Sequence, residues 1–165
     1  MKEINFYKHN RIFGIVAGLF SFVIFSLTVE PTASYWDCAE YISTSAKLQI
    51  GHPPGAPLFQ MLGAIFSILA FDVTQIAYAV NMMSVTSSAL TIMFLFWSIS
   101  LIAKEILKAK EIVKVSEAIK IFGSSFLGSI TFTFTDSFWY NAVEAEVYAM
   151  ATLILALLFW LGLKW

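Results

Sequence analysis

The sequence is poor in charge. Only 13% of its 165 residues are Asp, Glu, Lys or Arg, whereas 59% are hydrophobic and 16% are aromatic. A soluble domain contains about 25% charged and about 45–50% apolar residues. The composition therefore excludes an ordinary soluble domain and predicts an all-α integral membrane protein that crosses the bilayer several times.

Cysteine and proline are also scarce. The one cysteine, Cys38, excludes an internal disulfide and a thiolate metal cluster. All four prolines lie between residues 30 and 57, in the sequence EPTASYWDCAEYISTSAKLQIGHPPGAP. The sequence lacks a glycine-rich phosphate loop, the signature of a serine nucleophile and a zinc-ligand spacing. We therefore interpret this proline-containing loop as the functional segment, held at a membrane surface by the apolar segments around it.

Four apolar segments are candidates for membrane spans. Residues 12–29 contain 18 positions without charge, enough for about 27 Å of helix. The alternative is a cleaved signal peptide, but its apolar core is normally about 7–15 residues, followed by a small-residue cleavage site. The predicted spans are residues 12–29, 76–103, 121–138 and 147–163.

Two further segments are predicted to lie along the membrane. Residues 58–71 number only 14, which is short for a span, so we expect a short membrane-lying helix in the outer loop 30–75. Residues 104–120 carry five lysines and three glutamates among apolar positions, which predicts an amphipathic interfacial helix in a cytoplasmic loop. The interleaved glutamates argue against nucleic-acid binding.

The cations support this topology. With residues 58–71 not spanning, nine of the ten Lys and Arg residues fall on one side and only Lys47 falls on the other. The positive-inside rule makes the first side the cytoplasm, together with both termini. The acidic residues of the loop 30–75 and of the segment 136–146 then share the outer face, where they could form one extracytoplasmic site.

The first candidate cluster surrounds Asp37. On a helix, Asp37, Glu40 and Tyr41 lie on one face. Two carboxylates so placed repel each other, which suits one of them to proton abstraction. The pair could instead bind a divalent cation with a phosphate oxygen, or form only a solvated polar face.

The second candidate is His52-Pro53-Pro54. Prolines and glycines around it fix the backbone and prevent a regular helix, so we expect a rigid turn that holds His52 near the lipid headgroups. There the imidazole could donate to a phosphate or a sugar hydroxyl. The alternative is a simple start signal for the next helix, since proline favours the first helical turn.

The third candidate is the polar segment DSFWYNAVEAE and the residues after it. On a helix, Asn141, Glu144 and Tyr148 share a face, while Glu146 points about 160° away from Glu144. A helical segment would therefore turn only one of the two glutamates to a common site. The alternative is a solvated turn between spans with interfacial aromatic residues.

Four blocks of sequence carry a resemblance: SYWDCAEY, KLQIGHPPGAPLF, VNMMSVTSSALTIMFLFW and DSFWYNAVEAEVYA. They resemble the N-terminal part of a bacterial family long labelled a domain of unknown function. That family is similar to the protein O-mannosyltransferases among the GT-C membrane glycosyltransferases. The resemblance implies a GT-C-type helical bundle that transfers a sugar, with mannose a candidate, from a polyprenyl-phosphate carrier to a hydroxyl of a protein. A lipid acceptor is left open.

The resemblance also implies roles for residues. Asp37 corresponds to the catalytic base, whereas Glu40 departs by two positions from the adjacent Asp-Glu pair of O-mannosyltransferases. His52-Pro53-Pro54 matches the second motif of that family. The full set of candidate residues is Asp37 and Glu40 for catalysis, and Tyr41, His52, Pro53, Pro54, Asn141, Glu144, Glu146 and Tyr148 for substrate binding.

The resemblance further implies the bacterial inner (cytoplasmic) membrane, with the site facing the periplasm. We expect contact with membrane lipid, no nucleic-acid partner and no cofactor, with a divalent metal left open. The rival interpretation is a non-catalytic membrane scaffold or assembly subunit. A transporter is weaker, because the acids lie at the ends of spans. We expect the chain to be the front of a longer protein and to be inactive alone.

Overall fold

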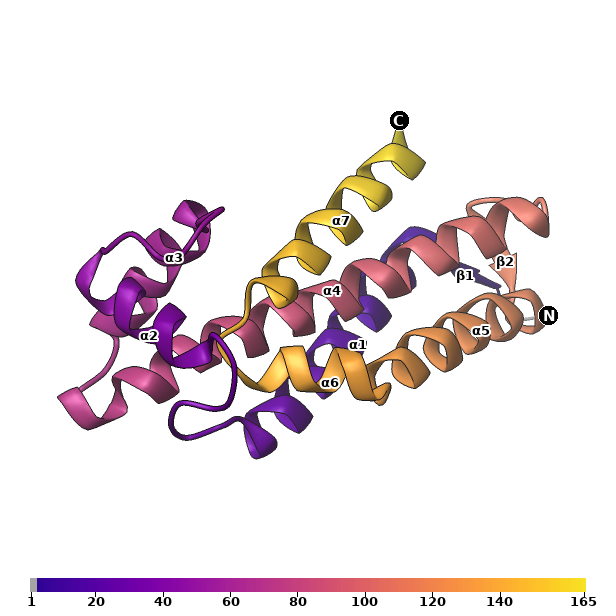
Figure 1. The fold of residues 1–165 in the computed structure, drawn as a ribbon. Helices are drawn as coiled ribbons and strands as arrows, with labels where there is room; N and C mark the ends of the chain where they lie inside the picture. Colours follow the sequence, from indigo (N-terminus) through magenta and orange to yellow (C-terminus); the bar gives the residue numbers. More distant parts are fainter. Residues whose placement is uncertain (1–2) are drawn as a thin grey trace.

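The computed structural model describes residues 3–165, and these form an all-α bundle with one small two-stranded antiparallel sheet (Figure 1). The all-α prediction is confirmed. The helices are α1 (Phe6–Thr28), α2 (Cys38–Lys47), α3 (Pro57–Ile68), α4 (Ile76–Ile106), α5 (Val115–Thr133), α6 (Asp136–Val143) and α7 (Val147–Lys164), with a 3-10 turn η1 (Val73–Gln75). The strands β1 (Glu3–Asn5) and β2 (Ile112–Lys114) pair antiparallel.

Helix α4 is the centre of the bundle and contacts all six other helices. Many of its buried residues are small and polar, namely Ser84, Ser87, Ser88, Thr91, Ser98 and Ser100. Small side chains let neighbouring helix backbones approach closely in a membrane protein. These small residues alternate with large buried residues of α4 such as Ile92 and Phe96, and they let the neighbouring helices pack closely against it.

Specific contacts fix the direction of each helix beside α4. Near the chain start, Ser100 donates a hydrogen bond of 2.6 Å to the Asn10 side chain, and the Trp97 indole donates one of 2.9 Å to the Asn10 carbonyl. The Trp160 ring of α7 lies 5.4 Å from the Trp97 ring. The start of α1 and the end of α7 therefore both lie beside the end of α4, opposite α2 and α3 (Figure 1).

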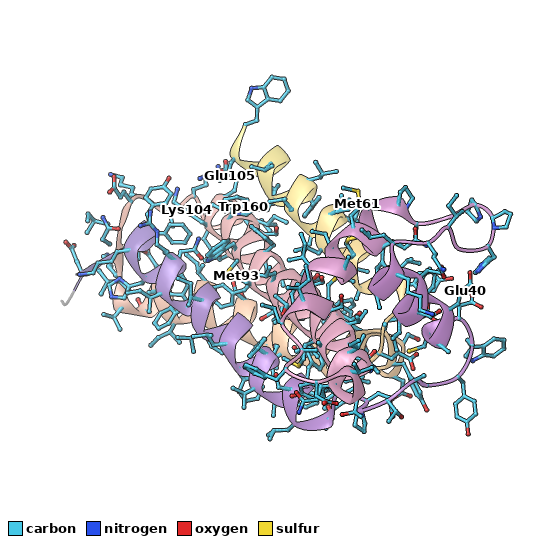
Figure 2. The ribbon with its side chains drawn as sticks, turned by 90° about the vertical axis from the view of Figure 1, so that its left-hand side faces the viewer. Glu40, Met61, Met93, Lys104, Glu105 and Trp160 are labelled. Carbon is cyan, nitrogen blue, oxygen red and sulfur yellow. The ribbon has the colours of Figure 1, made fainter. Side chains whose placement is uncertain are left out.

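Charge is segregated between the two ends of the bundle. Figure 2 shows Glu40 at one end and Lys104 and Glu105 at the other. Lys2 lies outside the described residues. Of the nine described cations only Lys47 lies at the α2 end; the other eight are Lys8, Arg11, Lys104, Lys108, Lys110, Lys114, Lys120 and Lys164. This placement agrees with the charge distribution on which the topology prediction rests.

The expected amphipathic helix over residues 104–120 is wrong. Helix α4 continues to Ile106, Lys108 takes a left-handed φ of 49°, and residues 112–114 form β2. Val113 is fully buried because β2 pairs with β1 at the chain start. Local periodicity could not reveal a partner more than a hundred residues away.

Three helices in the described residues are long and apolar enough to cross a membrane: α1, the unit of η1 with α4, and α7. The segment predicted at 121–138 has different bounds. Helix α5 ends at Thr133, where the N–H groups of Phe134 and Thr135 close tight turns, and α6 starts at Asp136. Helix α5 has 19 residues, but its first six include the charged Glu117 and Lys120. Its crossing of the bilayer therefore stays a prediction.

The short helix expected after the prolines is α3. It has 12 residues, about 18 Å of helix, and Pro57 occupies its first turn. Gly63 allows α3 to approach α2, because a Cβ there would lie 2.5 Å from the Ser45 hydroxyl oxygen. Its length is too short for a span of roughly 30 Å of hydrocarbon.

We expect the α2 end of the bundle to face the outside of the cell. Ser43 and Ser116 are exposed at opposite ends, and the native Cys38 is fully buried. A Ser43→Cys variant should react with a membrane-impermeant thiol reagent in intact cells, whereas Ser116→Cys should react only after the cells are opened. Labelling of Ser116→Cys in intact cells would overturn this topology.

Candidate active site

One buried side chain ties the outer loop to the bundle. Asn81 of α4 is fully buried, and its amide donates hydrogen bonds of 2.6 Å to the Glu30 carbonyl and 2.9 Å to the Thr32 carbonyl. The N–H of Glu30 in turn donates to the Val143 carbonyl at the end of α6. The segments on either side of the site are therefore fixed to the same helix.

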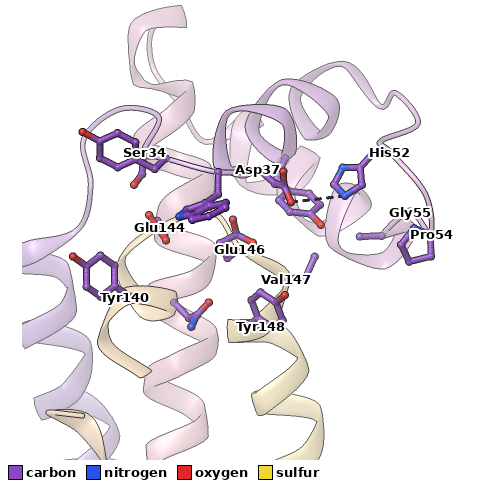
Figure 3. A pocket seen from close by; sticks show the side chains of 15 residues that line it. Ser34, Asp37, His52, Pro54, Gly55, Tyr140, Glu144, Glu146, Val147 and Tyr148 are labelled. Atoms are coloured by element: carbon purple, nitrogen blue, oxygen red, sulfur yellow. Dashed lines mark ion pairs between the residues drawn. The ribbon is translucent and has the colours of Figure 1, made fainter. Parts of the chain in front are cut away.

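His52 lies between two carboxylates. Its backbone N–H donates a hydrogen bond of 2.6 Å to Glu40 Oε1, and its ring Nδ1 lies 3.0 Å from Glu40 Oε2. Its other ring nitrogen, Nε2, lies 3.7 Å from Asp37 Oδ2 (Figure 3). The three side chains thus form a chain in the order Glu40, His52, Asp37.

Local structure explains this arrangement. Asp37 directly precedes α2 but makes no side-chain cap bond, although an N-cap aspartate usually accepts one from the helix backbone. Its carboxylate is therefore free to face His52. Gly51 lets the turn reach Glu40, because a Cβ there would lie 3.1 Å from Glu40 Oε1.

The protonation of this cluster differs from the expectation based on repulsion. Hydrogen bonds from the His52 backbone and ring lower the pKa of Glu40, and the Glu40 carboxylate raises the pKa of His52. The pair thus favours an ionised Glu40 beside a protonated imidazole. Repulsion from Asp37 would have shifted the pKa of Glu40 in the opposite direction.

A cavity of about 820 Å³ opens beside this cluster, a size that suits a small-molecule ligand. Eight of the predicted residues line it: Asp37, Tyr41, His52, Pro54, Asn141, Glu144, Glu146 and Tyr148. Glu40 and Pro53 are not in the lining, and Glu40 reaches the cavity only through His52. The structure therefore brings the two distant polar segments together around one cavity.

The helical case, in which only one of the two glutamates could face a common site, does not apply. Helix α6 ends at Val143 and α7 begins at Val147, so Glu144 and Glu146 are in extended backbone. The Glu146 N–H donates to the Glu144 carbonyl, so the chain turns tightly at Ala145, and both glutamates line the cavity. Burial, with Glu144 and Asp37 nearby, raises the pKa of Glu146 to about 7.

Seven lining residues were not predicted, and three of them are aromatic. Trp36 has a left-handed φ of 59° and is 92% exposed, which is unusual for so large an apolar side chain. Tyr140 is one of the interfacial aromatic residues in the alternative interpretation of the segment 136–146. The full set is Ser34, Tyr35, Trp36, Gly55, Ala56, Tyr140 and Val147. Aromatic faces beside carboxylates suit a ligand with apolar faces and hydroxyl edges.

The cluster also contains possible metal ligands. Asp37, Glu40 and His52 each offer one atom within 4.8 Å of the others. Nδ1 of His52 faces Glu40 and Nε2 faces Asp37, so a protonated imidazole offsets one of the two negative charges. The hydrogen bond and ion pairs among Asp37, Glu40 and His52 are enough to hold the three side chains at these distances.

Most of the chain, including the cavity residues from Asp37 onward, is similar to a known protein family. Residues 37–165 match the family described as the N-terminal domain of the protein O-mannosyl-transferase TMEM260. The chain is 27% identical over 141 residues to the protein O-mannosyl-transferase tmem260 of Dictyostelium discoideum, covering 85% of this chain and 15% of the relative. It is 25% identical over 135 residues to that of Mus musculus, covering 82% and 17%. The chain thus spans less than a fifth of either relative. No solved structure matches it.

We predict that Asn81 is required to hold the site together. Asn81→Ala removes three hydrogen bonds, two donated to the Glu30 and Thr32 carbonyls and a weak one accepted from the Cys38 thiol, and leaves the two carbonyls without a donor, which should cost about 2 kcal/mol or more. The melting temperature in detergent should fall clearly. Thr86→Val is the control, because the Thr86 hydroxyl bonds only to the Met82 carbonyl of its own helix. Equal melting temperatures for the two variants would contradict the role of Asn81.

Proposed function

Because the chain belongs to the family of the N-terminal domain of the protein O-mannosyl-transferase TMEM260, we propose that it forms the catalytic face of a membrane glycosyltransferase. The enzyme moves a sugar, with mannose the first candidate, from a polyprenyl-phosphate carrier to a hydroxyl of a protein. The observation that carries the proposal is the convergence of Asp37, His52 and Glu146 on one cavity beside the membrane helices.

Asp37 is proposed as the general base. An acceptor hydroxyl must lose its proton as its oxygen bonds to the anomeric carbon of the sugar. The bond from that carbon to the carrier phosphate breaks at the same time, and the phosphate leaves with the bonding electrons. Phosphate is a good leaving group, so the group most needed from the protein is a proton acceptor. The carboxylate of Asp37 faces the cavity and is not used by the helix that follows it.

Glu40 is proposed to position His52 and not to contact substrate. It holds both the backbone and the ring of His52, so that Nε2 is directed toward Asp37. A protonated His52 supplies the one positive charge in the cavity lining of the described chain, which otherwise contains no Lys or Arg. Its place next to the base suits it to receive the phosphate of the donor.

The charge distribution supports an extracytoplasmic site. Lysines and the arginine gather at the end of the bundle opposite the cavity, and cytoplasmic loops carry the excess of such residues. The cavity would then face the side on which proteins emerge after translocation. In a bacterium this is the periplasmic side of the inner membrane.

The test replaces Asp37 in the full-length protein. Asp37→Asn is nearly isosteric and removes the proton acceptor, so we expect sugar transfer to fall by about 10²–10⁴-fold. Binding of the carrier lipid should be largely kept. Glu40→Gln should cost less, because the amide keeps one oxygen that can accept from His52. Transfer is measured from a radiolabelled polyprenyl-phosphate mannose to an acceptor peptide.

Asp72→Asn is the matched control. Asp72 is an exposed acid of the same outer loop, and its side chain bonds only to Thr74. Its replacement should leave transfer nearly unchanged. Near-normal transfer by a folded Asp37→Asn enzyme would remove Asp37 from the mechanism. A full-length protein that transfers no sugar from any polyprenyl-phosphate donor would favour the scaffold interpretation.

A further inference from the structure

Glu146 is a buried acid that the proposed transfer step does not use. Its side chain lies in the cavity lining near Asp37 and Tyr148 (Figure 3), yet Glu146 is only 7% exposed. Within the described residues its carboxylate faces the N–H of Val147 and forms no hydrogen bond or ion pair with another side chain. A buried carboxylate without a cationic partner is costly when ionised, so a proton or a ligand must compensate for it.

The surroundings of Glu146 are negative. Glu144 precedes it in the same extended segment, and Asp37 approaches from the start of α2. His52 is the only cation among the groups that face it, and Glu40 already neutralises that charge. The remaining titratable neighbours are Tyr148 of α7 and two residues of α2, Cys38 and Tyr41, whose pKa values are raised chiefly by burial, which keeps both neutral. These neighbours favour the protonated form of Glu146.

We propose that Glu146 binds the donor in its protonated form, with its carboxyl O–H donating a hydrogen bond to a phosphate oxygen. The inference rests on the proposed function, which supplies the phosphate-bearing ligand. An ionised Glu146 would add a third acid, beside Asp37 and Glu144, to a cavity that must receive an anion. A protonated carboxyl removes this repulsion and adds a donor at a position where the lining has no Lys or Arg.

The direction of the pH dependence follows from the raised pKa. With a pKa of about 7, Glu146 is mostly protonated at about pH 6 and mostly ionised at about pH 8. Donor binding should therefore weaken as the pH rises through 7. If only the protonated form binds, the dissociation constant should rise about tenfold between these two pH values.

The experiment measures binding of a short-chain polyprenyl-phosphate mannose to the full-length protein in nanodiscs. Its phosphodiester keeps a single negative charge over this pH range. Calorimetry should show binding about tenfold weaker at about pH 8 than at about pH 6 for the wild type. Glu146→Gln has a neutral amide that can donate but cannot ionise, so its affinity should change much less with pH than that of the wild type, with His52 as the remaining titratable donor. Glu144→Gln is the matched control: Glu146 still titrates, so the pH dependence should remain but move to lower pH, because the charge of Glu144 contributes to the raised pKa of Glu146.

A second measurement uses the wild type alone and does not depend on a variant folding. Titrations at about pH 7.5 in two buffers of different ionisation enthalpy report the protons taken up on binding. The wild type should take up a substantial fraction of one proton per donor bound. Glu146→Gln should take up much less. Uptake that persists in a folded Glu146→Gln protein would belong to His52 and would overturn the assignment.

Each remaining outcome decides between the two proposals. Wild-type binding that does not change between the two pH values would overturn the role of Glu146 and leave the proposed function intact. A folded Glu146→Gln protein that binds at neither pH would show that the ionised carboxylate is needed, and would also overturn it. Wild-type binding abolished by a chelator would assign phosphate recognition to a metal ion instead. Absence of wild-type binding at every pH would remove the proposed function together with this inference.

Discussion

The amide of Asn81 is the contact on which the site depends. It sits inside α4, where a polar side chain is costly unless it is fully hydrogen-bonded, and it meets that cost with the carbonyls of Glu30 and Thr32. The chain leaving α1 is thereby fixed to the same helix that α6 and α7 pack against. Two polar segments separated by about a hundred residues can then share one cavity.

The surfaces suited to lipid and the polar residues of the site lie in different parts of the bundle. Apolar side chains of α1 and α7 remain exposed along their outer faces, as suits contact with lipid, and the interior of α4 is packed through small residues. Lysines lie at one end and the acidic cavity lies at the other. The short α3, with its proline start, lets the loop return to the surface without a further crossing.

Hydrophobic runs predicted the long helices well. Helix α7 spans Val147–Lys164 against a predicted 147–163, and α4 begins at the predicted Ile76. Helix α1 begins at Phe6, before the apolar run 12–29. Phe6 and Asn10 are buried by contacts with the end of α4 and with the two-stranded sheet. Length and hydropathy report on single segments, so they could not reveal such contacts between distant segments.

The same limit applies to the site. A helical period placed Asp37 near Glu40 and a proline turn singled out His52, since these signals are local. The hydrogen bond that the His52 backbone N–H donates to Glu40 depends on the conformation of the turn at Gly51. No local sequence pattern shows that conformation. The extended backbone at Glu144 and Glu146 arises because α6 and α7 end and start on either side of them. The polar and aromatic sequence from Asp136 to Tyr148 contains no proline or glycine that would have indicated the break between α6 and α7.

The choice of His52 in place of Lys or Arg has a physical reason under the proposed function. A permanent cation next to Asp37 would stabilise its ionised form and make it a poorer proton acceptor. His52 avoids this because Glu40 balances its charge, so the pair presents N–H donors with little net charge. Such a pair can direct a phosphate without placing a fixed positive charge beside Asp37. A cavity that holds both an anionic donor and a general base is served better by titratable groups than by fixed positive charge.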